Sequence, residues 1–205
     1  ADGSNVSTAV DGITTVLNAF KMESSRAEFV ANKMFQTVAK GKTTFAELAS
    51  YIAQAAPTAS ALGVSIEEVL AAVATMTKQG IPTSTAMVQI RNSMLALNKE
   101  LGDGWSKTYS FQEALEQVGI SGNYSAAALE KAFGRENISG VMALIGENAK
   151  NAADDLATMR GDSNALETAF QKVDSQVGHW PRLFQTVRAA ISDMGGSMDS
   201  ALKQI

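Results

Sequence analysis

The stretch from Gly63 to Pro82 constrains the fold most, because it marks one helix at both ends. Gly63 ends a preceding helix, and Ser65 with Glu68 forms an S-x-x-E capping box that opens the next one. Gly80, followed by Pro82, then ends that helix. Between these signals the apolar residues recur at steps of three and four: Ile66, Val69, Leu70, Val73 and Met76. The stretch therefore predicts a short helix packed on a core, with both glycines at positive φ.

Similar start and stop signals recur along the chain, and alternation typical of strands is hard to find. We expect helices over residues 6–22, 24–40, 44–55, 57–63, 65–79, 84–101, 110–119, 125–134, 139–160, 165–177 and 181–194. Thr44 with Glu47, and Ser110 with Glu113, repeat the capping-box pattern. The expected fold class is all-α, with a compact bundle of short helices in residues 1–135 and longer helices toward the C-terminus. Such short helices need tertiary packing to be stable.

Two parts are expected along the chain. Residues 1–160 form a helical core domain, and residues 161–205 form a helical extension that can continue into a longer parent chain. The chain starts at Ala1 without an initiator Met or a leader, so we expect a fragment of a longer polypeptide. No run of 18 apolar residues occurs, so no membrane span is expected.

Composition excludes several classes of function. The net charge is -4, and Lys and Arg are interleaved with acidic residues, which disfavours direct nucleic-acid binding. Cysteine is absent, so disulfides and thiolate metal sites are excluded. His179 is the only histidine and lies beside Trp180 and Pro181 in a predicted break, where a loop or packing role is expected. We therefore expect no metal and no cofactor.

Acidic residues provide the strongest suggestion of an enzyme. Glu23 followed by Ser24 resembles the catalytic start of lytic transglycosylases, in which a carboxylic acid protonates a glycosidic oxygen. The Gly-Leu-Met-Gln-type segment expected downstream is missing, so a helix boundary explains the pair better. Three further acid pairs are expected at helix caps or on solvated faces: Glu67/Glu68, Glu113/Glu116 and Asp154/Asp155. No catalytic residue and no enzymatic activity are therefore expected.

The nine methionines have two interpretations, a promiscuous binding groove or core packing. Five of them fall on predicted apolar stripes, which favours the core: Met34, Met76, Met87, Met94 and Met159. In the helix predicted over residues 84–101, the apolar positions form a narrow seam: Met87, Ile90, Met94, Leu97 and Leu101. A seam of this width needs one partner helix, either within the chain or from another subunit.

An ordered series of short motifs resembles the core region of phage tail tape measure proteins. The series comprises Val30-Ala31-Asn32, Thr43-Thr44, Leu48-Ala49, Pro57, Ala59, Ala61 to Glu68, Gly80-Ile81, Ser84, Ala86, Ile90-Arg91-Asn92, Leu95, Leu97, Ala114-Leu115, Val118-Gly119-Ile120, Phe133-Gly134-Arg135 and Ala143-Leu144. The resemblance covers residues 20–150. Thr83 and Met87 stand where the family often has glycine.

The resemblance implies a structural virion protein located in the tail, present in the host cytoplasm during assembly. Such proteins set tail length, scaffold the tail tube and take part in genome ejection. Implied partners are the tail tube protein, tail tip or baseplate proteins, tail assembly chaperones and further copies of the chain. Because a helix rises ~1.5 Å per residue, chain length can measure distance. The helix stops argue for a folded module within a longer ruler.

Two alternatives remain open. One is a helical interaction module of a contractile injection or secretion system without a ruler role. The other is a cell-wall hydrolase of the lytic transglycosylase type.

Overall fold

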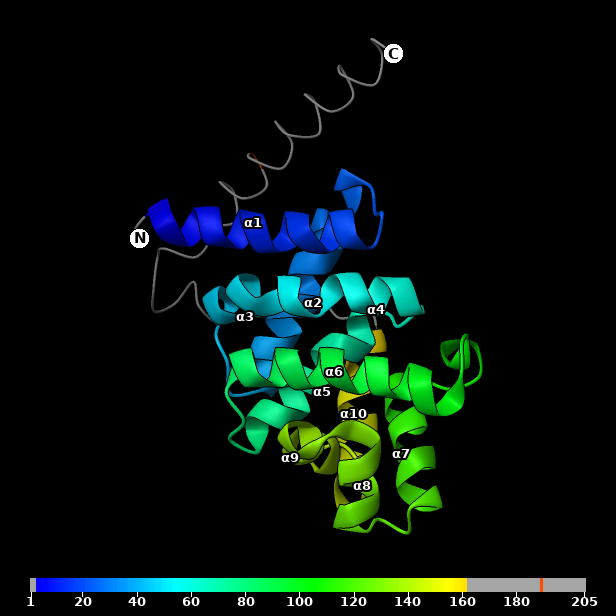
Figure 1. Cartoon of the computed structure of the whole chain (residues 1–205). Helices are drawn as coiled ribbons and strands as arrows, with labels where there is room; N and C mark the ends of the chain where they lie inside the picture. Colours follow the sequence, from blue (N-terminus) through cyan, green and yellow to red (C-terminus); the bar gives the residue numbers. More distant parts are fainter. Residues whose placement is uncertain (1–2, 162–188, 190–205) are drawn as a thin grey trace.

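The computed structural model describes residues 3–161 and residue 189, and the part up to residue 161 is a bundle of ten α-helices without a strand (Figure 1). The helices are α1 (Gly3–Ala19), α2 (Ala27–Lys40), α3 (Phe45–Tyr51), α4 (Ala56–Leu62), α5 (Ile66–Lys78), α6 (Thr83–Leu101), α7 (Phe111–Ser121), α8 (Ala126–Phe133), α9 (Ile138–Met142) and α10 (Ala149–Arg160). Five short 3-10 turns join them: η1 (Ser24–Arg26), η2 (Ile52–Gln54), η3 (Trp105–Lys107), η4 (Arg135–Asn137) and η5 (Gly146–Asn148). The all-α prediction is confirmed.

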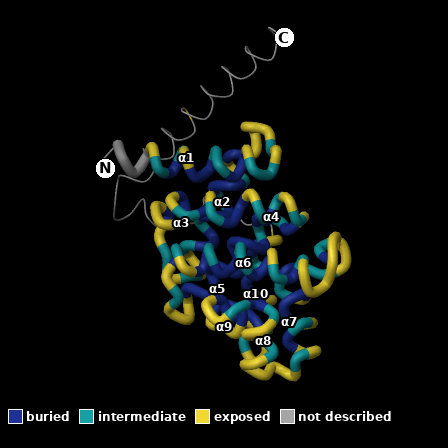
Figure 2. Tube along the Cα trace, in the orientation of Figure 1, coloured by how far each residue is buried: buried dark blue, intermediate teal, exposed yellow. Residues whose placement is uncertain are grey.

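Helix α5 lies at the centre of the bundle and is buried around most of its circumference (Figure 2). The predicted apolar stripe is fully buried, and the small side chains of Ala71, Ala72 and Ala74 on other faces are buried as well. Neighbouring helices pack on these faces, among them α2, α4, α6, α7 and α10. The prediction of a single buried stripe was therefore too narrow, because the small alanine side chains let further helices pack closely on the other faces of α5.

The predicted helix boundaries around α5 are confirmed in detail. Both hydrogen bonds of the Ser65–Glu68 capping box are formed, and so are those of the Thr44 and Ser110 boxes. Gly63 and Gly80 adopt left-handed conformations, with φ of 76° and 89°. Such conformations favour glycine because a Cβ atom is disfavoured there. Local sequence signals thus determine these ends without help from distant residues.

Helix α1 lies across one end of the bundle, and its Gly12 faces α3 (Figure 1). A Cβ atom on Gly12 would lie 2.5 Å from Cβ of Ala49 and 2.6 Å from its Cα. The two backbones can approach this closely only because Gly12 has no side chain.

The apolar seam of α6 is buried inside the chain itself. Met87, Ile90, Met94 and Leu97 are at most 1% exposed, whereas Leu101 is 37% exposed. The seam is covered by helices that precede α6 in the sequence, including α3, α4 and α5. Helices that follow α6, including α7, α8 and α9, cover it as well. The alternative of a seam reserved for another subunit is therefore wrong for these four residues. The five methionines predicted in the core are all buried.

The prediction of one helix over residues 139–160 is wrong. Gly146 has φ of 61°, and the chain turns there between α9 and α10, with η5 in between. The left-handed glycine interrupts the helical hydrogen bonds, and its N–H is bound by Glu116 from α7 at 3.1 Å. The longer helices expected toward the C-terminus are thus absent up to residue 161. The helices predicted over 165–177 and 181–194, and His179, lie outside the described residues.

Candidate functional site

Polar groups, four of them buried, gather where α10 packs on α2 and α5, and we call this set the α10 anchor. Its members are Lys33, Glu68, Thr75, Lys78, Asp155 and Arg160. Helix α10 is the last described helix, and Gly161 follows it. The α10 anchor therefore fixes the end of the described part of the bundle.

Lys33 of α2 holds the C-terminal end of α10 from outside that helix. Its ammonium group donates hydrogen bonds to the backbone oxygens of Met159 at 2.5 Å and Gly161 at 3.0 Å. The side chain is only 5% exposed, and the ring of Phe29 lies 5.2 Å from Nζ. Carbonyl groups at a helix C-terminus lack partners within the helix and attract positive charge. Lys33 thus acts as a C-terminal cap contributed by a distant helix.

Asp155 ties the middle of α10 to α5. Its carboxylate accepts a hydrogen bond from the Thr75 hydroxyl at 2.6 Å and forms an ion pair with the Lys78 ammonium at 2.5 Å. Asp155 is 4% exposed, but the Lys78 side chain is 38% exposed, so water reaches one side of the pair. The carboxylate therefore has both a neutral and a charged partner.

Glu68 connects three helices. One carboxylate oxygen completes the capping box with Ser65, while the other accepts the N–H of Phe111 at the start of α7 at 2.8 Å. Arg160 of α10 lies 3.8 Å from that second oxygen. The buried carboxylate is thus fully occupied by contacts that hold α5, α7 and α10 together.

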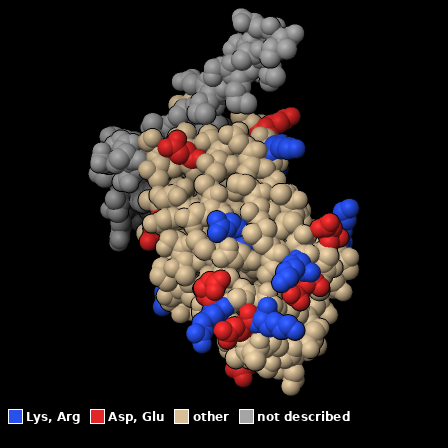
Figure 3. Space-filling view, viewed as in Figure 1, with Lys and Arg blue, Asp and Glu red and all other residues tan. Residues whose placement is uncertain are grey.

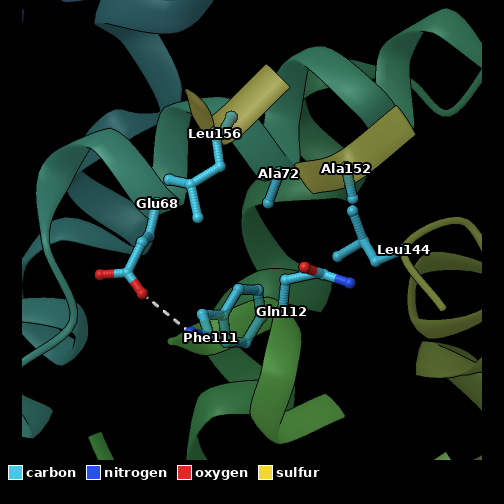
Figure 4. Close-up of a pocket in the computed structure, with 8 residues that line it drawn as sticks. Glu68, Ala72, Phe111, Gln112, Leu144, Ala152 and Leu156 are labelled. Carbon is cyan, nitrogen blue, oxygen red and sulfur yellow. Dashed lines mark hydrogen bonds between the residues drawn. The ribbon is translucent and has the colours of Figure 1, made fainter. Parts of the chain in front are cut away.

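A small cavity lies next to Glu68, between α5, α7 and α10 (Figure 4). Apolar side chains form most of its wall, among them Phe111, Leu144 and Leu156. Its volume is about 240 Å³ when regions open to solvent are counted, so the enclosed part is smaller. Small-molecule pockets usually measure roughly 300–1,000 Å³. The cavity is therefore a packing gap beneath α10 rather than a ligand pocket.

A second polar contact fixes the turn that precedes α10. Glu116 of α7 accepts hydrogen bonds from the Tyr124 hydroxyl and from the N–H of Gly146. The hydrogen bond to Glu116 raises the pKa of Tyr124, because it favours the protonated phenol. Tyr124 itself has a positive φ of 52°, so the turn between α7 and α8 is also unusual. Both turns therefore depend on one carboxylate.

The acidic residues considered as catalytic candidates are dispersed. Glu23 is exposed just before η1, at the predicted helix boundary, and the Ser25 hydroxyl donates to it at 3.4 Å. Glu113 caps α7, and hydrogen bonds from the backbone N–H and then the hydroxyl of Ser110 lower its pKa. Among residues 3–161, no group of three or more His, Asp or Glu side chains could hold a metal ion. No helix in this part of the chain could cross a membrane.

The expectation of caps or solvated faces is wrong for Asp155, which is buried although Asp154 is exposed. Asp155 falls on the same helical face as Ala152, Leu156 and Met159. This spacing was the signal available in the sequence. Lys33 likewise shares a face with Val30, Met34 and Thr37, but its partners could not be read from the sequence, because they are backbone carbonyls 126 and 128 residues away.

Charged side chains of both signs are mixed on the face shown in Figure 3. They gather over the part formed by α6 to α9 and are sparse over α3 and α4. Large apolar side chains are exposed singly on several elements: Leu95, Leu101, Ile120, Tyr124 and Met142. The visible face carries no basic stripe of the kind that binds nucleic acid.

Taken together, these residues define a helical structural module whose buried charged groups bind its own backbone and one another. A family model for phage-related minor tail proteins matches residues 1–204. The chain therefore belongs to the phage-related minor tail protein family, and it is a structural protein of the phage tail. The tape measure resemblance is thereby confirmed.

Two curated relatives are named as tape measure proteins. A probable tape measure protein of Clostridium phage phiCD119 is 32% identical over 228 residues, which covers 98% of this chain and 23% of the relative. The tape measure protein of Pneumococcus phage Dp-1 is 23% identical over 219 residues, covering 97% of this chain and 18% of the relative. The chain thus spans about a quarter or less of these relatives. No solved structure matches it.

Proposed function

We propose that the chain is a folded module of a tape measure protein that sets tail length, scaffolds the tail tube and takes part in genome ejection. The observation that carries this proposal is similarity along almost the whole chain to two tape measure proteins, each several times longer. Such a module forms one part of a ruler whose remaining length lies elsewhere in the protein.

The fold supports a module that adds little to the measured length. Residues 3–161 would extend about 240 Å as one continuous helix. They instead fold into ten helices, of which the longest has 19 residues. A compact bundle contributes much less distance per residue than an extended helix does, so this module is a terminal or anchoring part of the ruler.

The proposed partners are the tail tube protein, tail tip or baseplate proteins, tail assembly chaperones and further copies of the chain. The exposed apolar side chains of Leu95, Ile120 and Met142, each at least 50% exposed, are the first positions to test for such contacts. We also propose that the protein has no enzymatic activity, because the acidic side chains of residues 3–161 either serve in caps and polar contacts or lie dispersed on the surface.

Tail length provides the test of the ruler. In the phage that encodes the protein, residues 3–161 are deleted in one strain, and in another an equal number of residues is deleted from the remaining part of the protein that we propose to be the ruler. Electron microscopy then measures the tails. We expect the second deletion to shorten the tail by roughly 240 Å. The first should shorten it far less or prevent assembly.

Two measurements, tail length and peptidoglycan cleavage, separate the alternative functions. An interaction module without a ruler role predicts unchanged tail length after the second deletion. A lytic transglycosylase predicts peptidoglycan cleavage by the purified chain that is lost in Glu23→Gln. We expect no cleavage by either form, and cleavage that depends on Glu23 would overturn the proposal of a non-enzymatic protein.

A further inference from the structure

We propose that α10 is a detachable helix: it can leave its groove on α2, α5 and α7 while α1 to α9 remain folded. This proposal does not depend on the ruler function. It rests on how α10 packs, on the cavity beneath it and on the two polar contacts that bound it.

The first observation is that α10 packs mainly on one helix, α5, and contributes little to the main core. Only Ala152 of α10 belongs to the continuous core that includes helices α1 to α9. Its two large buried apolar side chains, Leu156 and Met159, form a small separate cluster with Ala71 and Ala74 of α5. Removal of α10 would therefore leave nearly the whole core intact, because apolar burial drives folding in proportion to the area removed from water.

The second observation is the chemistry of the α10 anchor. Lys33 of α2 and Asp155 of α10 are buried only while α10 is in place. Their partners are backbone carbonyls, a hydroxyl and a partly exposed ammonium. Burying charged groups costs desolvation energy that largely cancels their attraction. When α10 leaves, these groups regain water. The α10 anchor therefore fixes the register of α10, and its net stabilisation is only a part of the attraction between its groups.

The cavity between α5, α7 and α10 supports the same conclusion (Figure 4). Side chains that line a void lose dispersion contacts on the side that faces it. Leu156 and Ala152 of α10 line this cavity, so the apolar face of α10 is incompletely packed. The gap is confined to this part of the helix, because Met159 of α10 is buried as completely as Leu70 and Met87 of the main core.

The hinge for this motion lies at Gly146. Glu116 holds the N–H of Gly146 and the Tyr124 hydroxyl, which fixes the chain up to the start of η5. At the other end, Lys33 holds the carbonyl oxygens of Met159 and Gly161. The Glu116 contact before α10 thus belongs to the part of the bundle that stays folded. The Lys33 contact at the end of α10 must break before the helix can leave. Opening begins at Gly161 and proceeds toward η5.

Thiol labelling can test the proposal, because the chain contains no cysteine. Ala74→Cys places a thiol in the small cluster beneath α10, and Ala86→Cys places one in the main core on α6. Both alanines are 0% exposed, so the variants are matched. The rate of labelling by a soluble disulfide reagent is measured on the 205-residue chain without denaturant, after circular dichroism confirms that both variants fold.

We expect Ala74→Cys to label at least about 100-fold faster than Ala86→Cys, because a local opening exposes only the first site. Lys33→Met should accelerate labelling of Ala74→Cys at least about 10-fold, and labelling of Ala86→Cys by no more than the same factor, so Ala74→Cys stays the faster site by at least about 100-fold. Lys150→Met, an exposed position on α10, is the control and should change neither rate.

Equal rates at the two sites would overturn the proposal, because they would mean that both thiols become accessible only in global unfolding. Failure of Lys33→Met to accelerate labelling of Ala74→Cys would also overturn it. If Ala74→Cys fails to fold, Ala71→Cys in the same cluster replaces it.

Discussion

The first region of the bundle (residues 3–98) and the second (residues 99–161) are stabilised in different ways. Every one of the largest fully buried side chains lies between Ile13 and Leu97, except Phe111. Charged residues are sparse in the latter part of the first region, where those between residues 43 and 98 are Glu47, Glu67, Glu68, Lys78 and Arg91. They are frequent in the second region. The first region therefore depends mainly on apolar packing.

The second region depends on polar side chains that bind backbone groups across helices. Glu68 binds the N–H of Phe111, Glu116 binds the N–H of Gly146, and Gln89 donates to the carbonyl of Glu136 at 2.6 Å. Such contacts fix register and turns but contribute only modest net free energy, about 1 kcal/mol each. A short, frequently interrupted helical region can thus be well defined without a large core of its own.

A charged side chain introduced into the core of the first region should reduce the free energy of unfolding most. Met94 is 0% exposed, so Met94→Asp places an unpaired carboxylate in the core and should cost roughly 4 kcal/mol or more. Urea unfolding followed by circular dichroism measures the change. The control is Leu95→Asp, because the neighbouring side chain is 52% exposed and its replacement should cost about 0.5 kcal/mol or less. A folded, equally stable Met94→Asp variant would contradict the comparison.

Close backbone contact should make Gly12→Ala the next most damaging change. The new methyl group would overlap the Cα and Cβ of Ala49, so α1 and α3 must separate, at about 2 kcal/mol. Helix propensity alone predicts the opposite sign, a gain of about 1 kcal/mol. The free energy of unfolding therefore distinguishes the two effects. Ser7→Ala, at an exposed position of the same helix, controls for propensity.

The α10 anchor offers a matched pair in the second region. Asp155→Ala removes the partner of Thr75 and Lys78 and should cost about 1–2 kcal/mol, since Lys78 regains water. Asp154→Ala changes an exposed carboxylate one residue earlier and should cost less than about 0.5 kcal/mol. Similar losses in the two variants, measured by thermal unfolding, would show that the buried contacts of Asp155 contribute nothing specific.

Two glycines at helix ends should respond to different degrees. Gly63→Ala and Gly80→Ala each place a Cβ atom at positive φ, at about 1 kcal/mol. The Cβ atom at Gly63 would also lie 2.8 Å from the Ser106 hydroxyl oxygen, which donates to the Leu62 carbonyl, whereas no atom lies within 4 Å at Gly80. Gly63→Ala should therefore be the more costly variant in urea unfolding, and the reverse order would contradict this account.

The smallest predicted effect is an acid-dependent contribution from Glu113. Folding lowers the pKa of this carboxyl, so its contribution is present above the unfolded-state pKa and is lost as pH falls through the folded-state pKa. Glu113→Gln should reduce stability slightly near neutral pH and not at strongly acidic pH. Unfolding free energies across the acidic range measure this difference. A loss that persists unchanged at low pH would show that the charge is irrelevant.

The sequence predicted what depends on neighbouring residues. The capping boxes at Thr44, Ser65 and Ser110 each span only four residues of local chain, and all three are formed. The buried methionine positions followed from helical spacing. The break at Gly146 could not be placed in this way, because a glycine inside a helical pattern is tolerated at a cost of about 1 kcal/mol. Its left-handed conformation accompanies a contact to Glu116, 30 residues away.

The partners of the buried charged residues were the other feature beyond local reasoning. Asp155 is buried because the alanines of α5 let α10 approach, and Lys33 is buried because α10 ends beside it. Each depends on a helix that is distant in sequence. Family membership followed from an ordered series of motifs along the chain, whereas the polar contacts that position α10 required the three-dimensional arrangement.

The bond from Lys33 to Met159 spans 126 residues, which has a consequence for the order of folding during synthesis. At about 5–20 residues per second, a ribosome needs roughly 6–25 s to add this stretch. Throughout that interval the Lys33 ammonium remains hydrated on a nascent chain whose earlier helices can already collapse. The closing of α10 over α2 is therefore the last step of cotranslational folding for residues 3–161, and it follows release of this segment from the ribosomal exit tunnel.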